Sequence, residues 1–423
     1  MENYTVILLL LGAMVILSSI SEKIKVAVPI VLIVAGIAIG FIPQMPAIEI
    51  SSEIVFLLFL PPLLYDAAFK IHFREFRQHI YIISRLAVML VFVTTAGIAA
   101  VAYFLIPGMT WPLAFVLGAI LAPTDAVAAI SITKGIKLSS VTNTILEGES
   151  LLNDASALVA FKFALAALAG STFVLWKASL SFVFLLGGGF IVGYLVSKAV
   201  GFILKLIRRN GTAVLSIMLL SPFATYLVAE EVHASGVVAV VTLGISLSQL
   251  AASNFPGHLK AQSASIWDMI TFLLNGLIFI LIGLELPIVV KELDSTQLLT
   301  YTGYGFIIAI TALLLRTMSV FGNRQKLKKS FERQKFQTGR RKITESMLLS
   351  FQESMVISWS GMRGIISLAI AIGLPEVLGN GQPFPMKSTI LYITTVVVLI
   401  TIIGQGLLLP FIANSGKTDI PSE

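Results

Sequence analysis

The residues Glu147-Gly-Glu-Ser-Leu-Leu-Asn-Asp154 open a long apolar segment that continues to about Gly170. In a helix these polar groups would form two neighbouring stripes, because Glu147 and Asp154 are seven residues apart and Glu149 and Asn153 are four apart. An ionised side chain in bilayer hydrocarbon costs about 2.5–3.5 kcal/mol on insertion scales. The cluster therefore predicts a functional site at the start of a membrane-spanning helix. The alternative is a polar mouth that faces a water-filled vestibule.

The composition is that of a polytopic membrane protein. Hydrophobic residues make up 57% of the chain and charged residues only 12%, against roughly 45–50% and 25% in soluble domains. The net charge of +7 would suggest nucleic acid in a soluble chain, but here basic cytoplasmic loops account for it, and no nucleic-acid partner is expected. Cysteine is absent, which excludes disulfides and thiolate metal sites. The N-terminus lacks the basic region of a cleavable signal peptide, so we expect the first apolar run to be retained as a membrane helix.

Apolar runs of about 17 or more residues are candidates for membrane-spanning helices. The chain contains thirteen such ranges, which predicts an all-α membrane protein. They centre on residues 5–20, 26–42, 53–69, 84–106, 112–133, 145–169, 178–206, 213–230, 235–250, 266–286, 298–322, 355–374 and 389–413.

Lysine and arginine residues divide unequally between the two sides that these ranges define. Most of the 29 lie after odd-numbered ranges or in the C-terminal tail, whereas loops after even-numbered ranges hold Lys177, Lys291 and Lys387. The positive-inside rule therefore predicts an external N-terminus and a cytoplasmic C-terminus. The segment 323–354 is predicted to be a basic cytoplasmic loop lying against anionic headgroups, with a regulatory role as the alternative. Residues 414–423 are predicted to form a short cytoplasmic tail.

Two ranges contain residues that interrupt a helix. The fifth contains Pro123-Thr-Asp125, and the twelfth contains Gly361-Met-Arg-Gly364. Proline removes one backbone hydrogen bond and clashes with the preceding turn. At membrane depth such a break is tolerated only where the exposed backbone groups are buried in protein or line a cavity. The first break predicts carbonyl ligands for a cation beside Asp125, and a plain proline kink is the alternative.

Buried charges in the spans need partners. An unpaired Arg363 at membrane depth would be very costly. The helical rise places Arg363 about 16 Å and Glu149 about 13 Å from the cytoplasmic ends of their helices, so we expect these two residues to pair. The third range brings Asp66 to nearly the level of Asp125, and the alternative is a pair with Lys70 near the cytoplasmic end. Further possible charge partners of the site are Arg316 and Lys162.

The two interrupted ranges predict an internal repeat. Each is the fifth of six ranges if repeat one covers about 1–170, repeat two covers about 211–413, and a linking helix at about 176–208 joins them. Because the two repeats are offset by seven ranges, they would insert with opposite orientation. Inverted repeats with interrupted helices that cross near the midplane are typical of secondary transporters.

Together these motifs resemble those of the NhaP/NHE-type sodium/proton antiporters, in the monovalent cation:proton antiporter-1 family. The resemblance rests on Leu60-Pro-Pro-Leu-Leu-Tyr-Asp66, Ala122-Pro-Thr-Asp-Ala-Val127, Glu147-Gly-Glu-Ser-Leu-Leu-Asn-Asp-Ala155 and Gly361-Met-Arg-Gly364 with the apolar run to Pro375. It covers nearly the whole chain. It implies a thirteen-helix homodimeric transporter, not an enzyme, without cofactors. It also implies core helices at about 84–170 and 298–413, and dimerisation helices at about 1–70 and 176–286.

The resemblance also implies roles for individual residues. Asp154 would be the central carrier of cation and proton, together with Asp125. The implied ligands of the transported Na+ are Asp66, Thr124, Asp125, Ser150 and Asp154. The residues that match the family's structural network are Glu149, Asn153 and Arg363. Glu147 is expected to line the cytoplasmic funnel, and the Asn-Asp pair at 153–154 marks the electroneutral branch of the family.

Carboxylates crowded around one cavity repel one another, so at least one is expected to hold a proton until a cation displaces it. Together with the resemblance, this competition predicts electroneutral 1:1 exchange of Na+ or Li+ for H+ by alternating access in a bacterial or archaeal inner membrane. K+/H+ exchange by the same fold is the alternative, because K+ also binds oxygen ligands. A cation channel and an intramembrane aspartyl protease are remote alternatives. The interrupted repeats argue against a continuous pore, and the Gly-x-Gly-Asp motif of such proteases is absent.

Overall fold

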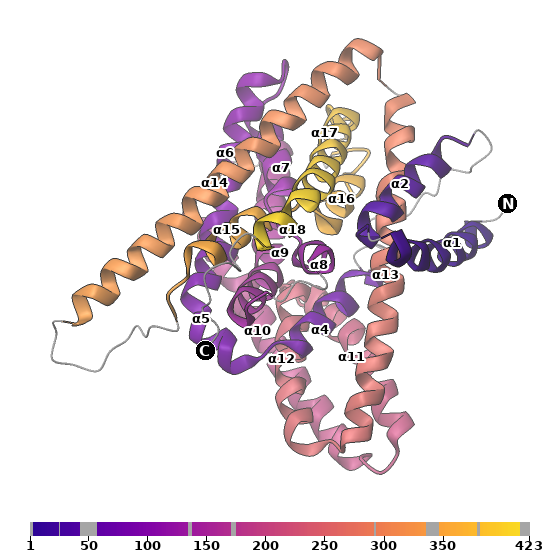
Figure 1. Ribbon diagram of the computed structural model, residues 1–423, viewed down its shortest axis with the longest axis vertical. Coiled ribbons are helices and arrows are strands. Elements are labelled where there is room, and N and C mark those ends of the chain that lie inside the picture. The colour runs from indigo at the N-terminus through magenta and orange to yellow at the C-terminus, as the bar shows by residue number, and fades with distance from the viewer. Residues whose placement is uncertain are drawn as a thin grey trace.

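The structure is a computed structural model that describes residues 3–24, 26–42, 57–133, 138–170, 175–291, 293–335, 347–378 and 381–414. These residues form helices (Figure 1), apart from short connections and one isolated bridge between Val377 and Pro383. In chain order the helices are α1 (Asn3–Ile24), α2 (Val28–Gly40), α4 (Leu60–Lys70), α5 (Phe73–Ser84), η1 (Arg85–Leu90), α6 (Val91–Leu105), α7 (Trp111–Leu121), α8 (Ala126–Ile132), α9 (Ser140–Leu168), α10 (Leu175–Leu206), α11 (Gly211–Glu231), α12 (Gly236–Asn254), α13 (Gly257–Lys291), α14 (Ser295–Lys335), α15 (Phe351–Trp359), α16 (Ile365–Ile372), α17 (Lys387–Leu399), η3 (Ile400–Gln405) and α18 (Gly406–Asn414).

The apolar ranges of the sequence coincide with helices. Within the described residues, seven helices are long and apolar enough to cross a membrane, and shorter apolar helices such as α2 and α7 accompany them. Large hydrophobic side chains such as Phe104, Phe202 and Leu206 are exposed on their outer faces. Because hydrocarbon offers no partners for backbone polar groups, helices are the form in which such segments cross it. The prediction of an all-α, multi-pass membrane protein is confirmed.

Local sequence explains where several helices begin. Pro61 and Pro62 lie in the first turn of α4, where the missing backbone N–H would have no helical partner in any case. Ser139 caps α9, because its Oγ accepts from the Thr142 backbone N–H at 3.1 Å. Ser350 and Glu353 form a reciprocal capping box at the start of α15. These signals fix the entry points of the helices that surround the site.

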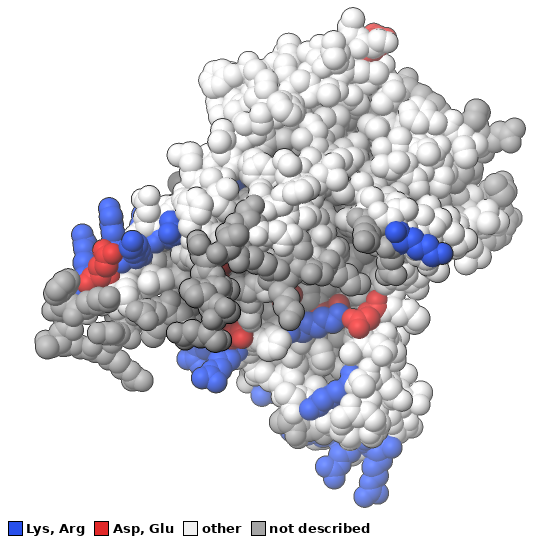
Figure 2. Space-filling view, in the orientation of Figure 1, with Lys and Arg blue, Asp and Glu red and all other residues white. Residues whose placement is uncertain are grey.

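The basic segment after the eleventh apolar range begins as a continuation of the preceding helix. α14 is 41 residues long and continues to Lys335, which gives it a length of about 60 Å. Residues 323–335 contain neither proline nor glycine and are rich in good helix formers. Residues 336–346 and 415–423 of the predicted loop and tail lie outside the described residues. On the face shown in Figure 2, Lys and Arg side chains gather over the C-terminal part of α14 and at the end of the molecule where α11, α12 and α13 lie.

Close backbone contact joins α2 to α13. A Cβ atom on Gly36 would lie 2.2 Å from the Ile280 carbonyl oxygen, and one on Gly283 would lie 2.2 Å from the Ile33 carbonyl oxygen. Small residues of this kind let membrane helices approach closely where burial of apolar surface gives no driving force. α13 is thereby held against α2 along one side of the molecule (Figure 1).

The two interruptions predicted from proline and glycine are present and meet each other. α7 ends at Leu121 and α8 begins at Ala126, while α15 ends at Trp359 and α16 begins at Ile365. The Asp125 backbone N–H donates to the Met362 carbonyl at 2.8 Å. Non-helical backbone in a membrane protein needs such partners inside the protein. Two pairs of half-helices are therefore joined at their breaks.

Candidate functional site

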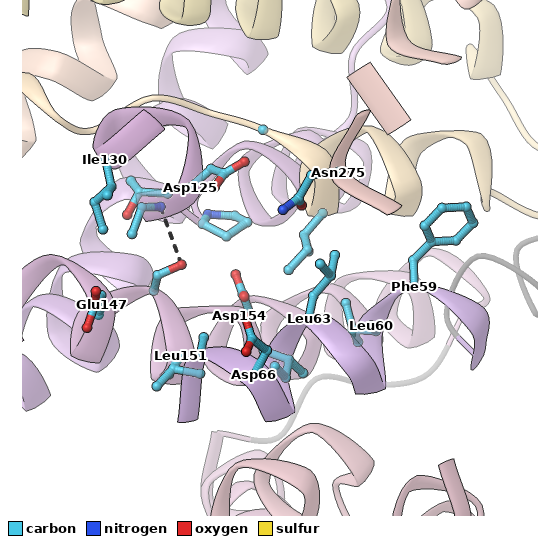
Figure 3. Close-up of a pocket in the computed structure, with 18 of the residues that line it drawn as sticks. Phe59, Leu60, Leu63, Asp66, Asp125, Ile130, Glu147, Leu151, Asp154 and Asn275 are labelled. Atoms are coloured by element: carbon cyan, nitrogen blue, oxygen red, sulfur yellow. Dashed lines mark hydrogen bonds between the residues drawn. The ribbon is translucent and has the colours of Figure 1, made fainter. Parts of the chain in front are cut away.

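A cavity of about 310 Å³ lies where the first break, α4, α9, α13 and α16 come together (Figure 3). Its wall contains all five residues predicted as ion ligands, and also Glu147. The polar residues of the wall are Asp66, Lys70, Thr124, Asp125, Ser131, Glu147, Ser150, Asp154, Asn275 and Ser367. The rest is mainly apolar. Residues from five separate segments of the chain thus surround one space.

Four carboxylates, those of Asp66, Asp125, Glu147 and Asp154, are spread around this wall. Asp154 on α9 is only 4% exposed and Asp66 on α4 is also buried. In the view of Figure 3, Asp66 and Asp154 lie on one side of the cavity and Asp125 and Asn275 on the other. Within the described residues, no three His, Cys, Asp or Glu side chains come together as a closed metal site. The side-chain oxygen atoms therefore surround the cavity without forming a closed metal site.

The backbone around the first break fixes Asp125. Its Oδ1 accepts from the Ala128 backbone N–H at 3.2 Å, which caps the first turn of α8. A Cβ atom on Gly364 would lie 2.0 Å from Asp125 Oδ2, so glycine is required there for the second break to approach. Ser150 Oγ accepts from the Ala126 backbone N–H at 3.5 Å, the dashed line of Figure 3. α9 is thereby joined to the start of α8.

A buried hydrogen-bond network lies behind the cavity wall. Both terminal nitrogens of Arg316 on α14 donate to the Glu149 carboxylate, with Nη2 to Oε2 at 2.8 Å. Arg316 is 1% exposed and Glu149 is 2% exposed. Thr124 Oγ1 donates to Glu149 Oε1 at 3.1 Å. The Asn153 amide donates to Thr124 Oγ1 at 2.9 Å and to the Thr124 carbonyl at 3.2 Å. Charge-assisted and bidentate hydrogen bonds are stronger than those between neutral groups. This network therefore links α9, α14 and the first break firmly.

The prediction that Glu149 pairs with Arg363 is wrong. Arg363 Nε donates to the Leu121 carbonyl at 3.0 Å, and Nη1 donates to the Gly361 carbonyl. The last carbonyls of a helix have no partner within it, and Arg363 occupies that place at the end of α7. Depth along the helices matched well enough, but the hydrogen bonds of Arg363 go to backbone carbonyls at the two breaks, and α14 brings Arg316 to Glu149. Arg316 is therefore the charge partner of Glu149.

Of two further charged residues considered for the site, Asp66 lies in its wall and Lys162 does not. Asp66 lines the cavity and also accepts from Lys70 Nζ at 2.8 Å, so both arrangements considered for it are present. Lys162 instead pairs with Glu230 at 3.7 Å, and its predicted role as a partner of the site is wrong. Eight residues after Asp154 is about 80° away around the helix, which is enough to turn Lys162 from the cavity.

Sequence reasoning gave too little weight to Asn275 and missed Ser367. Asn275 points into the cavity from α13 (Figure 3). Ser367 lies in the apolar run of α16, three residues after Gly364. Asn275 Oδ1 and Ser367 Oγ have no hydrogen-bond partner among the described residues. A polar residue close to a helix break was the signal available for Ser367.

Comparison with known proteins agrees with this fold. A family profile described as sodium/hydrogen exchanger, transmembrane, matches residues 6–415. An uncharacterized Na(+)/H(+) exchanger of Mycobacterium tuberculosis is 32% identical over 425 residues, which cover 97% of this chain and 74% of the relative. The sodium, potassium, lithium and rubidium/H(+) antiporter of Bacillus subtilis is 33% identical over 427 residues, which cover 98% of this chain and 62% of the relative.

A solved structure shares the architecture. The sodium proton antiporter MjNhaP1 from Methanocaldococcus jannaschii aligns with a TM-score of 0.73 and 20% identity, over 98% of each chain. At that identity the likeness shows the fold alone. The family match over residues 6–415 shows the family, and it confirms the resemblance that the four sequence motifs predicted. This multi-pass membrane protein belongs to the transmembrane sodium/hydrogen exchanger family.

Proposed function

We propose that the protein exchanges Na+ or Li+ for H+ across the membrane, and that cation and proton compete for Asp154. The observation that carries the proposal is the state of this carboxylate. Asp154 is buried against the cavity, and no basic side chain of the described residues forms a salt bridge with it. Glu149 and Asp66, by contrast, are paired with Arg316 and Lys70.

An ionised carboxylate buried without a counter-charge is costly. Asp154 can avoid that cost in two ways, either by holding a proton or by binding a cation. The two exclude each other, because both use the same carboxylate charge. Oxygen ligands suit hard cations, and the proposed additional ligands are Asp66, Thr124, Asp125 and Ser150.

The position of the cavity supports alternating access. Its wall joins α4 and α13, in the proposed dimerisation helices, to α8, α9 and α16, in the proposed core. A movement of the core helices against that scaffold would expose the cavity to one side and then to the other. We extend the proposal to thirteen spans in two inverted repeats and a homodimer. The basic side chains over the C-terminal part of α14 in Figure 2 support a cytoplasmic location for that end of the helix. The distribution of Lys and Arg along the sequence favours the same side for the C-terminus.

Asn153 bears on the stoichiometry. Its amide is committed to Thr124, so Asp154 is the one carboxylate of the Asn-Asp pair that faces the cavity. One cation replacing one proton carries no net charge, which favours electroneutral exchange. K+/H+ exchange is the second candidate, because the Bacillus subtilis relative is named as an antiporter of sodium, potassium, lithium and rubidium.

The test is dissipation of a pH gradient in proteoliposomes, with Na+, Li+ and K+ added in turn. Na+ and Li+ should each collapse the gradient, at a rate that does not change when a membrane potential is imposed. A response to K+ alone would select the second candidate. A response to none of the three cations would overturn the proposal, and a rate that follows the potential would contradict electroneutrality.

A further inference from the structure

Lys70 ends α4 and connects two aspartates. Its Nζ donates to Asp66 Oδ2 at 2.8 Å and to Asp268 Oδ1 on α13 at 2.7 Å. The Asp66 side chain is 11% exposed, the Lys70 side chain 44% and the Asp268 side chain 65%. The ammonium group therefore lies between a buried carboxylate and one that is mostly exposed.

These three residues stand at the boundary of the cavity. Asp66 and Lys70 belong to its wall, whereas Asp268 is not among the described residues that line it. The positively charged Lys70 ammonium thus contacts the Asp66 carboxylate. A cation in the cavity would also contact this carboxylate. Its ammonium is a compact point charge on a flexible four-carbon stem, with three donors that can be redistributed.

We propose that Lys70 is a tethered competitor of the transported cation: it neutralises Asp66 in the empty cavity and shifts onto Asp268 when the cation binds. This inference rests on the proposed cation/proton exchange. Asp268 makes the shift possible, because the displaced ammonium keeps a carboxylate partner. Partly exposed pairs contribute little net free energy, so Lys70 can exchange one of its two bonds at low cost.

The buried pair of the same site shows the contrast. Arg316 and Glu149 are 1% and 2% exposed, and separating a buried pair is strongly destabilising. That pair can hold the structure but cannot exchange partners during a transport cycle. The Lys70 pair has the opposite properties, since its ammonium is partly exposed and contacts a proposed ligand of the ion.

The proposal predicts opposite effects of two substitutions. Lys70→Met removes the competitor, so the apparent KM for the cation should fall, by at least about threefold for a unit charge at this range. Asp268→Asn removes the second partner of Lys70 and holds the ammonium on Asp66, so the KM should rise. In an Asp66→Asn background, Lys70→Met should have little further effect on KM, because the group over which they compete is gone.

The experiment measures exchange rate against cation concentration in proteoliposomes, using the alkali cation that the wild type exchanges fastest. Lys260→Met is the matched control, since Lys260 donates to the Ala252 carbonyl on the surface, and its KM should be unchanged. Asp268 is mostly exposed, so Asp268→Asn is expected to fold even where Lys70→Met does not. Thermal unfolding in detergent checks each variant.

The alternative is a static link between α4 and α13. In that case Lys70→Met and Asp268→Asn would both lower the unfolding temperature and leave KM unchanged, which would overturn the proposal. A shift of KM in the same direction for both variants would overturn it as well. A wild type that exchanges none of the cations would instead refute the proposed function, before any variant is compared.

Discussion

Arg316 on α14 donates to both carboxylate oxygens of Glu149 on α9, and Asp154 lies on α9 only five residues further along. Five residues correspond to about 140° around a helix. One helix therefore turns Glu149 toward a buried ion pair and Asp154 toward the cavity. The pair fixes the helix, and the remaining carboxylate is left to exchange its partner.

Breaking this pair should destabilise the protein strongly. Arg316→Ala leaves Glu149 as an uncompensated buried charge, for which we expect a loss of about 3–5 kcal/mol. Thermal unfolding in detergent measures it. Lys162→Ala is the comparison, because Lys162 and its partner Glu230 are both well exposed. The loss of unfolding free energy in this variant should be under about 1 kcal/mol.

The same measurement tests the assignment of the partner. A double-mutant cycle between Arg316→Met and Glu149→Gln should give a larger coupling energy than one between Arg363→Met and Glu149→Gln. A larger coupling for Arg363 would restore the pairing predicted from depth alone and contradict the structure.

Gly364→Ala should impair exchange in a folded protein. The added Cβ would lie 2.0 Å from Asp125 Oδ2, so Asp125 or the second break must move. Misplacement of a functional group by about 1 Å costs on the order of a hundredfold in rate in comparable sites, and we expect a loss of at least about tenfold. Gly303→Ala on α14 is the control, since open space surrounds it. A wild-type exchange rate for Gly364→Ala would refute the contact.

Asn153→Asp should reduce stability. The Asn153 amide donates to the Thr124 hydroxyl and carbonyl, whereas an ionised aspartate can only accept. The substitution leaves buried acceptors facing each other, with an expected cost of about 1–3 kcal/mol. Thermal unfolding of Asn153→Asp beside Asn153→Ala measures this. If Asn153→Asp unfolds at the wild-type temperature, the amide does not hold the first break.

Much of the site was predictable because its signals are local. Pro123, Gly361 and Gly364 act on their own backbone, so both breaks were found from sequence. The spacing of Glu147, Ser150 and Asp154 on α9 likewise identified residues that line the cavity.

Contacts between helices were predicted less well. Sequence position gives the depth of a residue along its helix. Whether Arg363 or Arg316 pairs with Glu149 also depends on how each helix is rotated and tilted. The same limitation explains Lys162, which was predicted as a possible charge partner of the site but is turned toward Glu230. Ser367 lies within an apolar helix, and only the fold brings it to the cavity wall.

The most direct test of the account is proton release when Na+ is added to the purified protein in weakly buffered detergent solution. A carboxylate that exchanges a proton for a cation releases up to about one proton per chain. The account predicts this release from the wild type and none from Asp154→Asn, with unfolding curves that show both to be folded. Undiminished proton release from Asp154→Asn would contradict the claim that cation and proton compete for Asp154.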